Sequence, residues 1–66
     1  MPLVQVTIME GRTTEKKEKF CKMVADAAVE CLDVELKQVR VMINEIPPEH
    51  WTIGGVSVAR MREKNN

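Results

Sequence analysis

The sequence predicts an α/β (α+β) fold, in which a single βαβ unit with parallel strands is followed by a short C-terminal β-hairpin and completed by oligomerisation. Three observations lead to this prediction. Two segments alternate apolar and polar residues, a longer segment between them repeats its apolar residues every three or four positions, and a Gly-Gly pair follows. With 66 residues, the chain is expected to form one domain over residues 1–66.

Two β-strands are predicted, at Leu3–Met9 and at Val39–Ile46. Both alternate, and a helix between them favours a parallel pair. The residues expected to face the helix are Val4, Val6, Ile8, Val39, Val41 and Ile43. The opposite face then carries Arg40, Met42 and Asn44, and it is too apolar to be left in water, so a second subunit is expected to cover it.

The segment between the strands predicts a helix over Thr14–Cys31, with Thr13 or Thr14 as its N-terminal cap and Glu15 in its first turn. A single apolar stripe is expected to pack on the sheet. Its members are Phe20, Met23, Val24, Ala27, Ala28, Cys31 and Leu32.

The rest of the chain consists of connections and a tail. Asp33–Lys37 is expected to connect helix and strand, with room for one helical turn, and Pro47-Pro48 ends the second strand. The Gly54-Gly55 pair predicts a hairpin that runs through residues 56–58. Residues 60–66 are charged and are expected to be frayed.

A chain of this size needs additional stabilisation. Cys21 and Cys31 lie on the predicted helix about 15 Å apart, too far for an intrachain disulfide, so free thiols are expected. The only histidine is His50, and no spacing of Cys and His suits a metal site. Oligomerisation remains as the expected source of stability.

The charge pattern argues against several classes of partner. Ten basic and ten acidic residues cancel, and no basic stripe is interleaved with aromatic residues, which argues against a nucleic-acid partner. No apolar run of 18 residues and no secretory signal pattern occurs, so the expectation is a cytoplasmic protein without a membrane partner.

Pro2 follows the initiator methionine, and such a small second residue favours removal of Met1. The exposed proline would be a secondary amine that can accept a proton. An apolar site near cationic arginines would lower the pKa of this amine toward neutrality. The structural alternative is that Pro2 only opens the first strand.

Arg12 and Arg40 are candidate carboxylate binders, because a guanidinium pairs with a carboxylate through two parallel hydrogen bonds. For Arg40, a structural salt bridge to Glu45 or Glu10 is the alternative. Trp51 could line an apolar pocket or belong to the core, and His50 is expected at the surface without a partner.

These features, in their order, resemble the 4-oxalocrotonate tautomerase family nearly from end to end. The resemblance rests on Met1-Pro2 before an alternating strand, the Glu10-Gly11-Arg12-Thr13 turn, Val39-Arg40-Val41, and the segment from His50 to Gly55. It implies a hexamer of βαβ subunits built as a trimer of dimers. It also implies an isomerase for 2-hydroxydienoates and 2-oxo acids that uses no cofactor and no metal and serves aromatic compound catabolism.

The resemblance also assigns roles to residues. Processed Pro2 is the base that moves a proton between the enol and keto forms, and Arg40 binds the 2-oxygen and the adjacent carboxylate. Arg12 binds the distal carboxylate, and Trp51, where the family often has Phe, forms the apolar wall. Further pocket-lining positions are matched more loosely by Met9 and Arg62.

Two alternatives remain open. In a haloacrylate dehalogenase or hydratase of the same superfamily, a carboxylate that activates water should follow the aromatic residue closely, whereas here Thr52 and Ile53 follow Trp51. From another class, the chain could be a noncatalytic assembly module that retains the fold.

Strand geometry predicts that a site is shared between subunits. Pro2 and Arg12 lie at opposite ends of the first strand, more than about 20 Å apart in one chain. Arg40 begins the second, parallel strand and is expected at the Pro2 end. An antiparallel pairing of two subunits would bring the Arg12 end of one chain to the Pro2 end of the other.

Overall fold

The computed structural model describes residues 1–64, and it has the predicted order of elements as far as the C-terminal hairpin. The βαβ unit consists of β1 (Leu3–Met9), α1 (Thr14–Leu32), the 3-10 helix η1 (Leu36–Gln38) and β2 (Arg40–Ile46). It is followed by β3 (Thr52–Ile53), β4 (Val56–Ser57) and α2 (Val58–Lys64). The fold class is confirmed, and the predicted ends of β2 and α1 each differ by one residue.

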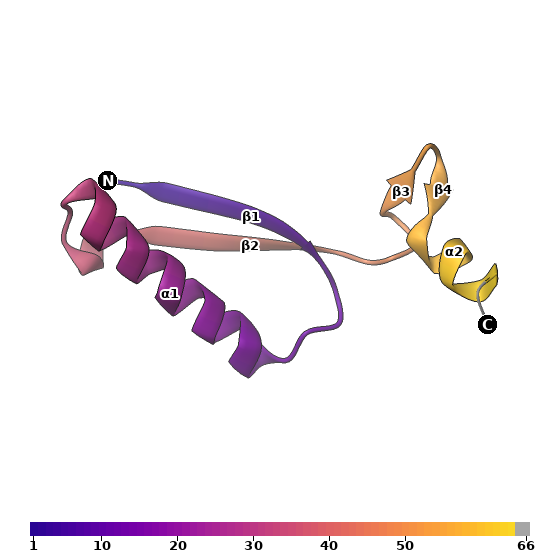
Figure 1. The fold of residues 1–66 in the computed structure, drawn as a ribbon, viewed down its shortest axis with the longest axis horizontal. Helices are drawn as coiled ribbons and strands as arrows, with labels where there is room; N and C mark the ends of the chain where they lie inside the picture. Colours follow the sequence, from indigo (N-terminus) through magenta and orange to yellow (C-terminus); the bar gives the residue numbers. More distant parts are fainter. Residues whose placement is uncertain (65–66) are drawn as a thin grey trace.

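β1 and β2 form a parallel two-stranded sheet, and α1 lies along one face of it (Figure 1). Val4 is opposite Val41 and Val6 is opposite Ile43, and these four side chains are half-buried. On the other face, Arg40, Met42 and Asn44 are exposed, as predicted. Val39 is an exception among the predicted strand residues, because it caps η1 and precedes β2.

Both ends of α1 have well-defined caps. The Thr13 hydroxyl accepts a hydrogen bond from the Lys16 amide at 3.2 Å, which satisfies one of the free donors at a helix N-terminus. At the C-terminus Asp33 adopts a left-handed conformation with φ 56°, and its amide donates to the Val29 carbonyl. The N-terminal cap is one of the two that the sequence offered, Thr13 or Thr14, whereas the cap at Asp33 was not predicted.

The predicted apolar stripe of α1 is partly wrong. Ala28 is buried, and the half-buried residues of the helix are Lys17, Cys21, Val24, Ala25 and Val29. Five members of the predicted stripe are exposed instead, namely Phe20, Met23, Ala27, Cys31 and Leu32. The apolar arc of this helix is wider than the two-stranded sheet, so one part of it packs and the neighbouring part remains open.

The C-terminal hairpin forms as predicted, except that Val58 belongs to the following helix. The expected frayed tail is wrong over residues 60–64, which lie in α2. Gly54 and Gly55 have φ values of 61° and 85°, the positive values that a two-residue hairpin turn of type I′ requires. The Ser57 hydroxyl accepts a hydrogen bond from the Arg60 amide at 3.1 Å, as an N-terminal cap does. The remaining part of the expected tail, residues 65–66, lies outside the described residues.

The molecule is elongated, because residues 47–64, here called the C-terminal arm, extend beyond the end of the sheet (Figure 1). Its extents are 46 × 24 × 14 Å and its radius of gyration is 15.6 Å. A compact chain of this length would have a radius of gyration of about 11 Å. None of the helices described in residues 1–64 is long and apolar enough to span a membrane.

Candidate active site

Pro2 and Arg40 meet at one end of the sheet. The Arg40 amide donates a hydrogen bond to the Pro2 carbonyl at 3.0 Å, and the next residue, Leu3, is the register partner of Arg40. Met1 is 84% exposed, whereas Pro2 is half-buried. The parallel register therefore places the predicted base beside the start of β2, as the sequence predicted.

The side chain of Arg40 is exposed and bonded to the main chain. Its Nη1 donates to the carbonyl oxygen of Lys37 at 2.8 Å. Neither Glu45 nor Glu10 forms an ion pair with it, so the structural salt bridge considered for Arg40 is absent from residues 1–64. The guanidinium therefore has no carboxylate partner among the described residues.

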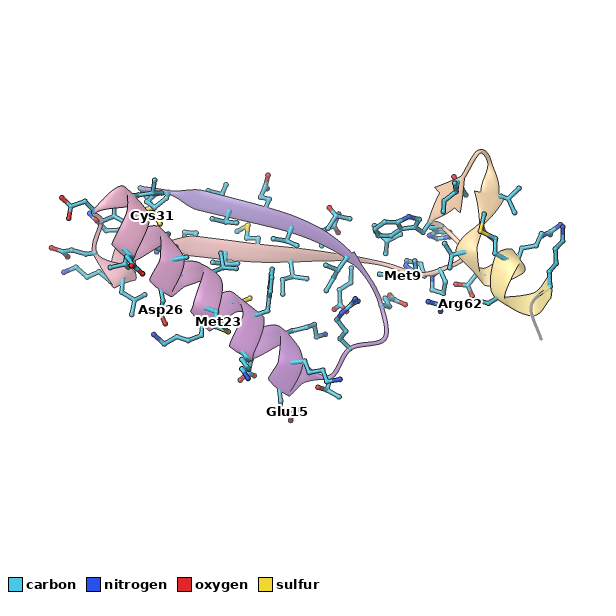
Figure 2. The ribbon with its side chains drawn as sticks, viewed as in Figure 1. Met9, Glu15, Met23, Asp26, Cys31 and Arg62 are labelled. Atoms are coloured by element: carbon cyan, nitrogen blue, oxygen red, sulfur yellow. The ribbon has the colours of Figure 1, made fainter. Side chains whose placement is uncertain are left out.

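Met9, Arg12 and Arg62 meet at the opposite end of β1. The Arg12 Nη1 donates to the Met9 carbonyl at 3.0 Å, and Arg62 Nη2 lies 3.4 Å from the Met9 sulfur. Figure 2 shows Met9 and Arg62 next to each other where the C-terminal arm meets the sheet. Met9 therefore contacts both Arg12, in the turn after β1, and Arg62, in helix α2.

Trp51 lies in the arm, directly before β3, and is half-buried. Its carbonyl accepts a hydrogen bond from the Val58 amide at 2.8 Å, and the Ala59 amide donates to the Pro48 carbonyl. These two bonds connect the segment that precedes the hairpin to the start of α2. His50, the neighbour of Trp51, is exposed as expected.

The candidate residues therefore form two separate groups within one chain. Pro2 and Arg40 lie at the start of β1, while Met9, Arg12 and Arg62 lie at its end. Pro2 and Met9 are seven residues apart on an extended strand, which corresponds to about 23 Å. A small substrate cannot contact both groups in a single chain.

The family model described as tautomerase enzyme matches residues 2–61. The chain belongs to the tautomerase family. A 2-hydroxymuconate tautomerase from Pseudomonas sp. (strain CF600) is 44% identical over 62 residues, which cover 94% of this chain and 98% of that protein. A probable tautomerase from Ralstonia nicotianae is 43% identical over 63 residues, which cover 96% of this chain and 90% of that protein.

Solved structures agree with this assignment. The heterohexamer 4-oxalocrotonate tautomerase from Chloroflexus aurantiacus J-10-fl matches with a TM-score of 0.86 at 45% identity, over 94% of this chain and 100% of that chain. A 4-oxalocrotonate tautomerase homologue of the tomaymycin biosynthetic pathway matches with a TM-score of 0.91 at 38% identity, over 98% of this chain and 100% of that chain. This tautomerase is an isomerase of the 4-oxalocrotonate tautomerase type.

One feature of the tautomerase was not predicted from its sequence, namely an ion pair between helix and sheet. Lys17 Nζ lies 2.9 Å from Glu45 Oε1, and both side chains are partly buried. The spacing of Lys17 from Cys21 and Val24 places it on the packed side of α1, where a long side chain can reach a carboxylate on β2. Glu45 is therefore paired with Lys17, and it forms no ion pair with Arg12 or Arg40.

The described residues of the tautomerase offer no arrangement of three His, Cys, Asp or Glu side chains that could hold a metal ion. Cys21 and Cys31 are free thiols, as predicted from their spacing on the helix.

Proposed function

We propose that this tautomerase converts 2-hydroxydienoates such as 2-hydroxymuconate to their 2-oxo isomers, with the secondary amine of processed Pro2 as the general base. The observation that supports the proposal is the main-chain hydrogen bond from the Arg40 amide to the Pro2 carbonyl, which brings residue 2 beside an arginine that forms no ion pair among residues 1–64. The exposed position of Met1 supports its removal by an aminopeptidase.

The proposed reaction transfers one proton within the substrate. The Pro2 amine accepts the proton of the 2-hydroxyl group, the electron pair of the O–H bond becomes part of the carbonyl, and the double bonds shift. The protonated amine then returns the proton to a carbon atom of the same dienol. One base with a pKa near neutrality can perform both steps, and neighbouring positive charge lowers the pKa of an amine.

Arg40 is proposed to bind the 2-oxygen and the adjacent carboxylate. Negative charge develops on that oxygen as the hydroxyl proton leaves, and a preorganised cationic donor stabilises it. Arg40 is free for this role because, within residues 1–64, its guanidinium donates only to main-chain carbonyl groups. Arg12 is proposed to bind the distal carboxylate.

The apolar wall of the pocket is assigned to Trp51, with Met9 and Arg62 as further lining residues. Arg62 and Met9 are already in contact in one chain, and Arg12 bonds to the same methionine through its carbonyl. These contacts support a shared pocket edge at this end of β1. An apolar wall excludes water and strengthens the electrostatic interactions of the arginines.

The proposed assembly is a hexamer, arranged as a trimer of dimers. A single chain buries only Ala28 among the described residues, and large apolar side chains such as Phe20, Met23 and Met42 remain exposed. A chain with so little core is expected to gain its stability by association. The related structure from Chloroflexus aurantiacus is a heterohexamer, so a hexamer of identical chains is the specific part of this proposal.

Two subunits paired antiparallel would complete each active site. The Arg12 end of one β1 then lies beside the Pro2 end of its partner, and the twofold axis generates two equivalent sites. This arrangement reconciles the wide separation of Pro2 and Arg12 in one chain with a substrate that must reach both.

The direct test compares processed protein with protein that retains Met1, obtained by inhibiting methionine aminopeptidase and verified by mass spectrometry. The decrease of 2-hydroxymuconate absorbance measures turnover. Processed protein should be active and the Met1-bearing form should be nearly inactive, because the proline nitrogen is then an amide. Equal activity of both forms would contradict the proposal.

A further inference from the structure

A cavity of about 310 Å³ lies between helix α1 and the sheet, next to the turn that carries Arg12. Ile8 and Ile43 of the sheet and Phe20 of the helix supply apolar walls, and Arg12, Lys16 and Lys17 line the same cavity. This volume lies at the lower end of the range of small-molecule sites. The cavity is therefore apolar inside and has three cationic side chains around it.

The three cations differ in whether their charge is balanced. Lys17 is paired with Glu45 at 2.9 Å. Arg12 donates to the uncharged carbonyl of Met9. Lys16 forms no ion pair with any residue among 1–64. Within the described part of the chain, two positive charges thus remain uncompensated at the cavity and no acidic side chain lines it.

The start of α1 adds to this positive field. Lys16 lies in the first turn of the helix, and its amide is bonded to the Thr13 cap. The N-terminal end of a helix carries a partial positive charge. An apolar wall next to two free cations suits an anion with an apolar body, such as the far end of an unsaturated dicarboxylate.

We infer that Lys16 is a further substrate-binding residue, which acts with Arg12 to hold the distal carboxylate and so favours dicarboxylates over monoacids. The inference rests on the proposed function, in which Arg12 binds that carboxylate. Lys16 is exposed, so its contribution is of the size typical of exposed ion pairs and decreases with salt.

The test uses Lys16→Gln with Lys19→Gln as its matched control. Lys19 is exposed on the same helix and does not line the cavity, so both variants lose one charge from α1. In processed protein, Lys16→Gln should raise KM for 2-hydroxymuconate about three- to fivefold. It should change KM for the monoacid phenylenolpyruvate less, while Lys19→Gln should behave like the original protein. The effect should shrink at 0.5 M salt.

A binding measurement separates this inference from the proposed function. Muconate is a dicarboxylate without the 2-hydroxyl group, and its dissociation constant can be measured by calorimetry without turnover. Lys16→Gln should weaken this binding about three- to fivefold, and Lys19→Gln should not. If muconate binding depends on Lys16 while the processed protein turns over neither substrate, the inference holds and the proposed function fails.

Three results would overturn the inference. The first is an unchanged KM for 2-hydroxymuconate and an unchanged muconate affinity in Lys16→Gln, in protein whose turnover still requires Pro2. The second is an equal effect on the dicarboxylate and the monoacid. The third is an equal effect of Lys19→Gln, which would indicate a general influence of net charge. In each case the proposed function stands if processed protein is active.

Discussion

The amide of Arg40 donates a hydrogen bond to the carbonyl of Pro2 at 3.0 Å, one residue before the strand pairing of β1 with β2 begins. This bond fixes the N-terminal residue of the processed chain against the start of β2. Chain termini are often poorly ordered, and this bond holds the terminus in place. A catalytic group at a chain end needs such a fixed position.

Replacement of Pro2 by alanine is predicted to lower kcat about a hundredfold for 2-hydroxymuconate, within the range that general base catalysis contributes. The variant keeps an N-terminal amine but loses the secondary amine of the ring. Steady-state kinetics on protein with verified removal of Met1 measures the effect. Activity equal to that of the original protein would remove Pro2 from the mechanism.

Arg40→Ala and Arg12→Ala are predicted to have different kinetic effects. Loss of Arg40 should lower kcat about a hundredfold or more, because it stabilises charge that develops in the transition state. Loss of Arg12 should raise KM for a dicarboxylate about tenfold and matter less for a monoacid. The reverse pattern would exchange the two roles. Sedimentation of Arg40→Ala checks that the oligomer persists.

Subunit mixing tests the composite site. On a dicarboxylate at low concentration, Pro2→Ala chains should retain about a hundredth of the activity and Arg12→Ala chains about a tenth, but a mixed dimer would contain one site with both residues intact. Random pairing makes half of the dimers mixed, so about a quarter of all sites should be active. The two chains should be denatured and refolded together, with mass tags to verify mixing. No recovery in verified mixed oligomers would indicate that each site belongs to one chain.

Thr13→Ala is predicted to lower the free energy of unfolding by about 1 kcal/mol per chain, because it removes the N-terminal cap of α1. Thr14→Ala is the matched control, since the cap hydrogen bond is accepted by Thr13. Urea unfolding at one fixed protein concentration measures both. Equal losses in the two variants would show that the capping bond contributes little.

Much of the fold could be predicted because local signals and tertiary structure agree. The alternation in β1, the Thr13 cap and the Gly54-Gly55 turn each appear where the sequence placed them. The face of α1 was harder to predict. Phe20 and Met23 are apolar at helical spacing, but they lie beside the packed side, which includes Lys17. An apolar pattern shows that a surface avoids water and does not show which neighbour covers it.

The candidate site was predictable only in part for a related reason. Arg40 begins a strand that runs parallel to the strand that follows Pro2, and this order correctly places the two residues at the same end of the sheet. Alternation does not show which side chains of distant segments touch. Only the structure therefore identifies the Met9–Arg62 contact and the Lys17–Glu45 pair.

Among residues 1–64 only Ala28 is buried, and this also has a consequence for how the protein folds. With so little core of its own, a chain is expected to reach its native structure only by encountering other copies, which act on it as a stabilising ligand does. The rate of refolding should then rise with chain concentration. Dilution alone should therefore unfold the protein.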